Sequence, residues 1–191
     1  AVLDALRKQL ALCLETQDPL ELSPMLLLGD PGIGKTHFAR RLSNLLGTGY
    51  GFVSMSSLTA GWVLSGASSQ WKNARSGKVF DTLVNGDYAN PVMVLDEIDK
   101  AGGDSQYDPL GALYSLLEQQ TAREFVDEFA EVPLDCSDIV WVATANDAAR
   151  AATDASVRRS RGGVHTGGRW SVMTIGCPPG RWCRWCRRRR P

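Results

Sequence analysis

Residues 29–36 read Gly-Asp-Pro-Gly-Ile-Gly-Lys-Thr and fit the pattern G-x-x-x-x-G-K-[ST]. A short apolar run precedes this stretch, and apolar residues at helical spacing follow it as far as Leu46. Glycines in such a turn let backbone N–H groups point inward and form a nest for anions at a helix N-terminus. We therefore expect Lys35 to reach the outer phosphates of a nucleotide and the Thr36 hydroxyl to bind Mg²⁺. The full set of expected nucleotide-binding residues is Asp30, Pro31, Gly32, Ile33, Gly34, Lys35 and Thr36.

A second polar site is expected where the apolar run Val92 to Leu95 ends in Asp96 and Glu97. An Asp at the end of a buried strand can hold Mg²⁺, directly or through water. The neighbouring Glu97 is then placed to activate an attacking water as a general base. Solvated acids at a strand end are common, but the phosphate-binding pattern upstream favours the metal and catalytic interpretation. A pair of acids also suits nucleotide hydrolysis better than transfer to a metabolite.

Helix and strand patterns alternate along the chain. Helical spacing is found at residues 2–14, 36–46, 79–84 and 110–117, and strand-like apolar runs at 25–28, 52–55, 92–95 and 139–143. Nearly all-apolar strands between helices are typical of a parallel sheet covered on both faces, with ligands at the carboxyl ends of the strands. We expect an α/β three-layer sandwich with a mostly parallel sheet, and the pattern stops after Asp147.

The charge is distributed unevenly. The 191 residues hold 21 Lys and Arg against 21 Asp and Glu, yet residues 1–150 carry −9 and residues 151–191 carry +9. We expect residues 1–147 to form the nucleotide-binding domain and residues 148–191 a basic tail, disordered or out of frame. The tail could bind nucleic acid or an anionic surface, or bind zinc through His165, Cys177, Cys183 and Cys186. Our preferred hypothesis is an out-of-frame translation, because the tail has Arg, Trp, Cys, Gly and Pro but no Lys.

Taken together, the motifs resemble the AAA+ ATPases, and among them the ATPase module of the Lon protease family. The resemblance covers residues 25–147. It is carried by residues 29–36 (Walker A), Leu95-Asp96-Glu97-Ile98-Asp99-Lys100 (Walker B), Asp108-Pro109 with Ala112-Leu113, Val132-Pro133-Leu134-Asp135-Cys136-Ser137 and Ala143-Thr144-Ala145-Asn146.

The resemblance implies ATP and Mg²⁺ as cofactors and two further groups of functional residues. Asn146 is similar to the sensor residue that places the attacking water against the terminal phosphate. Residues 66–77 are similar to the loop that grips unfolded polypeptide in the ring, with Trp71-Lys72 at the gripping positions. There Lys72 replaces an apolar residue, and the alternative is that Trp71 packs back onto the body of the domain.

Two features of the family are not recognisable. No Ser-Lys protease domain follows, so we expect no peptidase activity in this chain. After Asp147 we find no arginine finger, final strand or helical lid domain, although Arg158 and Arg159 lie at a suitable distance. We therefore expect a chain truncated before its last strand and lid, with slow hydrolysis, since an arginine finger contributes about 10³–10⁵ in rate.

The expected function is an ATP hydrolase of Lon-like AAA+ type that, when complete, remodels protein substrates as a homo-oligomeric ring. The alternatives are a non-hydrolysing nucleotide-binding module that recruits nucleic acid through the tail and, less well supported, a metabolite kinase. A first residue of Ala suggests a fragment or a processed product. No signal peptide or apolar run of membrane-spanning length is found, and Cys13 and Cys136 are typical of buried cytosolic thiols, so we expect a cytoplasmic location.

Overall fold

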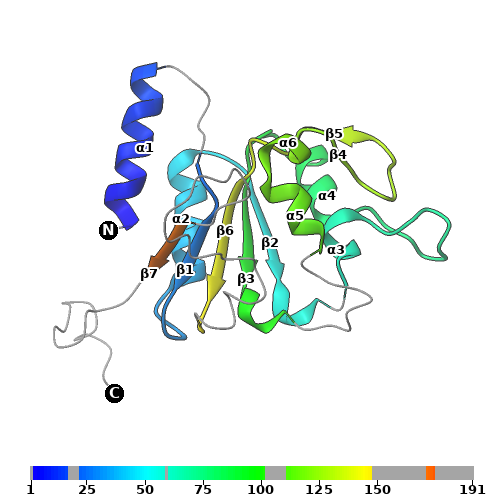
Figure 1. Ribbon diagram of the computed structural model, residues 1–191, viewed down its shortest axis with the longest axis horizontal. Helices are drawn as coiled ribbons and strands as arrows, with labels where there is room; N and C mark the ends of the chain where they lie inside the picture. Colours follow the sequence, from blue (N-terminus) through cyan, green and yellow to red (C-terminus); the bar gives the residue numbers. More distant parts are fainter. Residues whose placement is uncertain (1, 17–21, 59, 102–110, 148–170, 175–191) are drawn as a thin grey trace, which may run out of the picture.

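The computed structural model describes residues 2–16, 22–58, 60–101, 111–147 and 171–174. Five strands form one parallel sheet in the order β2-β3-β6-β1-β7 (Figure 1). Their bounds are β1 Met25–Leu28, β2 Tyr50–Ser54, β3 Val92–Asp96, β6 Val140–Ala145 and β7 Ser171–Thr174. The parallel α/β fold predicted from the sequence is confirmed.

Both faces of the central sheet are apolar, because alternate residues of β1, β3 and β6 enter different hydrophobic clusters. In β3, Met93 and Leu95 pack in one cluster, and Val92 and Val94 in the other. The first cluster also contains residues of α3 Trp62–Ser65, α4 Lys78–Val84 and α5 Gly111–Leu117; the second contains residues of α1 Val2–Thr16 and α2 Lys35–Leu46. The sheet is thus the middle layer of three, as expected.

Glycines mark both ends of α2. Gly34 before it and Gly47 after it have positive φ angles of 97° and 65°, a conformation that costs side-chain-bearing residues energy. The helix places the end of the phosphate-binding stretch in its first turn, so the predicted strand-turn-helix unit is confirmed.

Several short elements were not predicted. They are α3, α6 Gln119–Ala122, two 3₁₀ turns (Met55–Ser57 and Ile98–Lys100), and the antiparallel hairpin of β4 Phe125–Val126 with β5 Pro133–Leu134. Each spans only two to four residues, too few for a repeating pattern to be visible in the sequence.

Strand β7 corrects one expectation. We expected the sheet to stop before a last strand, but residues 171–174 pair in parallel with β1, from Met25 opposite Ser171 to Leu28 opposite Thr174. A four-residue run is a weak sequence signal. In space, the free N–H and C=O groups along the edge of β1 provide a template for such a strand.

The N-terminal helix α1 confirms the helix predicted from Val2 to Leu14. Its Leu6 is buried in the second cluster, whereas Leu3, Leu12 and Leu14 are exposed. Among the described residues, no helix has the length and apolar character needed to cross a bilayer.

Candidate active site

The predicted phosphate-binding stretch forms a turn between the end of β1 and the start of α2 (Figure 1). The Gly29 N–H donates to the Ala145 carbonyl at 3.4 Å, which joins the start of the turn to the end of β6. Gly32 has a φ of 77°, and an added Cβ at Gly32 or Gly34 would meet no described atom within 4 Å. The turn therefore leaves open space in front of its backbone, as a phosphate nest requires.

Lys35 lies in this turn with only 7% of its surface exposed. Its Nζ donates to the carbonyls of Gly29 (2.7 Å) and Asp30 (3.0 Å) and to Oδ1 of Asn146 (2.8 Å). Burial lowers the pKa of Lys35 because it disfavours the charged amine, and nearby carboxylates, Asp99 first, oppose this shift. The ammonium is thus held at the carboxyl ends of β1 and β6 together.

One carboxylate oxygen connects the two predicted motifs. Oδ1 of Asp96, at the end of β3, accepts hydrogen bonds from the hydroxyls of Thr36 (2.7 Å) and Thr144 (2.8 Å). The Thr144 Oγ1 in turn accepts from the Glu97 N–H at 2.9 Å. Thr144 is 1% exposed and lies on β6, the neighbour of β3, so it fixes Asp96 and the backbone of Glu97 at once.

Glu97 leaves the sheet in an unusual conformation. Its φ and ψ are 58° and 52°, in the left-handed region that few residues other than glycine adopt. Its carboxylate accepts a hydrogen bond from Nζ of Lys100, and this contact is the main reason that the pKa of Glu97 lies below its usual value. Glu97 is therefore ionised at neutral pH, as a general base must be.

Asp99 holds Asn146 in place from the turn after β3. Its Oδ2 accepts the N–H groups of Asn146 (3.1 Å) and Asp147 (3.0 Å), and the side chain is 6% exposed. Its buried Oδ1 has no hydrogen-bond partner among the described residues. The backbone of Asn146 is thus fixed by Asp99 while its side chain accepts from Lys35.

The donor set fits a Mg²⁺-bound nucleotide. A hydroxyl and a carboxylate 2.7 Å apart are hard oxygen ligands of the kind Mg²⁺ shares with substrate phosphates. The open glycine turn, with its lysine and the N-terminus of α2, suits the phosphates themselves. The structure brings residues 29–36, Asp96, Glu97 and Asn146 together at the carboxyl ends of β1, β3 and β6, and their roles stay predictions.

The loop at residues 66–77 lies apart from these residues, between α3 and α4, and projects from the body of the domain (Figure 1). Trp71 is 51% exposed, and its ring meets that of Trp62 edge to face, with centroids 5.3 Å apart at 85°. The ring thus packs on Trp62 of α3, as the alternative interpretation expected in part, and it is otherwise exposed. The gripping role of Trp71 stays a prediction. Lys72 is also exposed.

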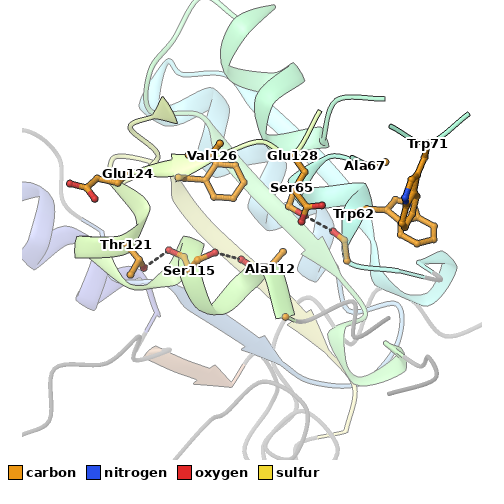
Figure 2. A pocket seen from close by; sticks show the side chains of 13 residues that line it. Trp62, Ser65, Ala67, Trp71, Ala112, Ser115, Thr121, Glu124, Val126 and Glu128 are labelled. Carbon is orange, nitrogen blue, oxygen red and sulfur yellow. Dashed lines mark hydrogen bonds between the residues drawn. The ribbon is translucent and has the colours of Figure 1, made fainter. Parts of the chain in front are cut away.

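A cavity of about 630 Å³ opens beside these two tryptophans. Figure 2 shows Trp62 and Trp71 at one end of it, with Ala112 and Ser115 of α5 along one wall. Phe125, Val126 and Glu128 of the β4–β5 hairpin contribute to its lining. The tryptophan loop thus borders a hollow formed by α3, α5 and the hairpin.

Two site residues were quoted from the sequence without a role. Thr144 and Asp99 contact the predicted residues through bonds that span 47 or 48 positions of the chain, which no local pattern reveals. A polar residue inside an apolar strand was the available signal for Thr144. Asp108-Pro109, Arg158, Arg159, His165, Cys177, Cys183 and Cys186 lie outside the described residues.

A parallel sheet with a glycine-rich turn after β1 and an acidic end of β3 is the arrangement of an α/β phosphate-loop NTPase domain. The chain belongs to the ATPase family associated with various cellular activities (AAA), whose family model matches residues 25–166. The match thus extends past residue 147, where we expected the domain to end.

Among curated proteins, the chain is similar to Lon proteases. It is 34% identical over 129 residues to Lon protease of Halothermothrix orenii, covering 67% of this chain and 16% of that protein. It is 35% identical over 130 residues to Lon protease 2 of Thermus thermophilus, covering 68% and 16%. It is 36% identical over 125 residues to Lon protease of Karelsulcia muelleri, covering 65% and 15%. The chain is a Lon-like AAA ATPase domain, and the match spans about a sixth of the length of these relatives.

Proposed function

We propose that this chain binds ATP with Mg²⁺ and hydrolyses it at the carboxyl edge of the sheet. Residues 30–36 hold the phosphates, Thr36 and Asp96 hold Mg²⁺, Glu97 takes a proton from the attacking water, and Asn146 orients that water. The observation that carries the proposal is the pair of contacts that joins the motifs, Thr36 to Asp96 and Lys35 to Asn146.

The protein's part in this chemistry is positioning and electrostatics, as in other phosphate-loop enzymes. The bound Mg²⁺ neutralises negative charge that develops on the phosphates. The hydrogen bonds of Thr144 keep Asp96 and Glu97 in a fixed relation, so that the metal ligand and the base cannot move independently. Asp99 likewise fixes the backbone of Asn146 through its hydrogen bond to the Asn146 N–H.

We further propose that the complete protein assembles into a homo-oligomeric ring and uses this energy to remodel unfolded polypeptide in protein quality control. The support is the similarity to Lon proteases and the exposed Trp71 at the surface of its loop. In this proposal Trp71 supplies the apolar contact to the polypeptide. Lys72 next to it makes the grip less apolar than an aliphatic neighbour would.

Nucleotide binding tests the first part. Titration with a fluorescent ATP analogue and Mg²⁺ should show saturable binding that Lys35→Ala abolishes and Glu97→Gln preserves. Phosphate release by the native chain should be slow, because no arginine-finger motif is recognisable after residue 147. Glu97→Gln should abolish the remaining phosphate release. Release that is insensitive to Glu97→Gln contradicts the hydrolytic role, and binding without any release favours the non-hydrolysing module.

We also propose that the functional unit is residues 1–147 and that residues 148–191 are a separate basic segment, with residues 171–174 as its one described contact with the sheet. Translation of the other two reading frames of the coding DNA tests the out-of-frame hypothesis. If neither frame continues the AAA pattern after the codon for Asp147, the hypothesis fails.

A further inference from the structure

The loop that carries Trp71 is closed at its base. It starts at Gly66, directly after α3, with a φ of 84°, and it ends at Gly77, directly before α4. Near the base the Ala67 N–H donates to the Arg75 carbonyl at 3.0 Å. The two ends therefore lie side by side, and the loop has one narrow attachment to the domain.

A buried carboxylate occupies this attachment. Asp127 follows β4 at the tip of the β4–β5 hairpin and is 0% exposed. Its Oδ2 accepts the Gly77 N–H at 2.7 Å, and its Oδ1 accepts the N–H groups of Phe129 and Ala130, each at 3.0 Å. A buried carboxylate is costly without such donors, so these three bonds fix it in one place.

There is no room for a side chain at either glycine of the base. A Cβ on Gly66 would lie 2.5 Å from Oδ1 of Asp127, and a Cβ on Gly77 would lie 2.2 Å from the Leu64 carbonyl oxygen. Each distance is too short for a real contact, so neither position accepts a side chain without displacement. Asp127 thus touches both ends of the loop, one by a hydrogen bond and the other by close packing.

Two further bonds join the hairpin to the last residue of α3 and to the loop that follows it. The Glu128 N–H donates to the Ser65 carbonyl at 2.8 Å, and the Ser69 hydroxyl donates to Oε1 of Glu131 at 3.1 Å. The hairpin tip therefore holds the loop at its base and along one flank. The outer part of the loop, with Trp71 against Trp62, contributes the end of the cavity in Figure 2.

We propose that Asp127 is a positioning residue for polypeptide binding: its carboxylate fixes both ends of the 66–77 loop and thereby sets where Trp71 stands at the surface. This rests on the proposed role of Trp71. Asp127 itself is buried and does not contact the polypeptide.

The test compares Asp127→Asn with the native chain. Asparagine keeps the shape of the side chain, but its NH₂ group cannot accept a hydrogen bond. At least one of the three backbone N–H donors therefore faces this NH₂ group and loses its acceptor. We expect trypsin to cleave after Lys72 and Arg75 about tenfold faster, since one lost bond of about 1.4 kcal/mol raises the open population tenfold. Cleavage at sites outside the loop, such as Arg40 and Arg41, and the affinity for ATP with Mg²⁺ should stay within about twofold.

The functional readout is the affinity for fluorescein-labelled, reduced and carboxymethylated α-lactalbumin, measured by anisotropy with ATP and Mg²⁺ present. Asp127→Asn should weaken it severalfold and reduce the near-ultraviolet circular dichroism of the tryptophan pair. Gly66→Ala, which displaces the same carboxylate by a different route, should reproduce both effects. Asp135→Asn is the matched control, because Asp135 also accepts a backbone N–H, from Ser137 at 3.0 Å, but is exposed and lies directly after β5, where its bonds go to Ser137.

The outcomes separate the two proposals. Unchanged cleavage after Lys72 and Arg75 in Asp127→Asn overturns the positioning role, and so does a uniform rise in cleavage or a loss of ATP binding in both variants. If Trp71→Ala leaves the affinity for the unfolded protein unchanged, the proposed role of Trp71 fails instead, whatever the cleavage pattern.

Discussion

Replacement of Thr144 by valine tests the connection between the metal ligand and the base. The change keeps the shape of a side chain that is 1% exposed and deletes a hydroxyl that donates to Asp96 and accepts from Glu97. Loss of the bond to a carboxylate costs about 1.5–3 kcal/mol, and an unsatisfied N–H about 1 kcal/mol or more. The added methyl group returns about 0.8 kcal/mol of burial, so we expect a net loss of about 2 kcal/mol.

Equilibrium urea unfolding, followed by circular dichroism, measures this loss. For a chain of this size it corresponds to about 4–8 °C in Tm. Thr144→Ser is the matched variant, because it keeps the hydroxyl and loses only a methyl group, and we expect it to lose about half as much. Thr82→Val deletes an exposed hydroxyl bond within α4 and should change the stability by no more than about 0.5 kcal/mol.

The comparison of the two Thr144 variants decides the question. If Thr144→Val is no less stable than Thr144→Ser, the hydroxyl does not hold Asp96 and Glu97 together, and the structural reasoning is wrong. An unchanged slope of unfolding against urea would show that both variants expose the same surface as the native chain.

Three other predictions concern the pKa of Glu97, the reactivity of the Cys136 thiol and the backbone conformation of Gly47. Lys100→Ala should raise the pKa of Glu97, and NMR titration of the Glu97 carboxyl carbon measures this pKa. In the native chain the Lys100–Glu97 contact contributes to stability above the unfolded-state pKa near 4.5, and this contribution is lost as the pH falls through the lowered pKa of the folded state. An unshifted titration contradicts this. Cys136, whose pKa burial raises to about 12, should resist iodoacetamide at pH 8 until the chain is unfolded, and mass spectrometry of early native samples should find it unmodified. Gly47→Ala should lower the free energy of unfolding in urea by about 1 kcal/mol, because alanine is strained at the φ of 65° found there. A steric clash is not the cause, since an added Cβ meets no atom within 4 Å. A variant as stable as the native chain would contradict the backbone strain.

The central strands could be predicted because they are buried on both faces. Val92 to Leu95 are 0% exposed, so the sequence needs four consecutive apolar residues there, and such a run is visible without any structure. The turn at residues 29–36 was predictable for a similar reason, since its backbone conformation requires glycine at fixed positions.

The remaining parts depend on contacts that are distant in sequence. Asp127 looks like one more surface acid in an acidic segment, and only the fold shows that it is buried under the base of a loop 50 residues earlier. Thr144 and Asp99 gain their roles from neighbouring strands. Strand β7 exists because the edge of β1 is free to pair, which is a property of the sheet and is absent from the sequence of residues 171–174.

The site also draws its residues from most of the length of the domain. Its bonds join residues 60 positions apart (Thr36 and Asp96), 48 apart (Asp96 and Thr144) and 111 apart (Lys35 and Asn146). Contacts this distant in sequence are associated with slow folding. Neither half of the domain can contain the site alone, and a chain still leaving the ribosome acquires it only after β6 has emerged. If the site binds nucleotide as proposed, binding would report that β1, β3 and β6 have come together.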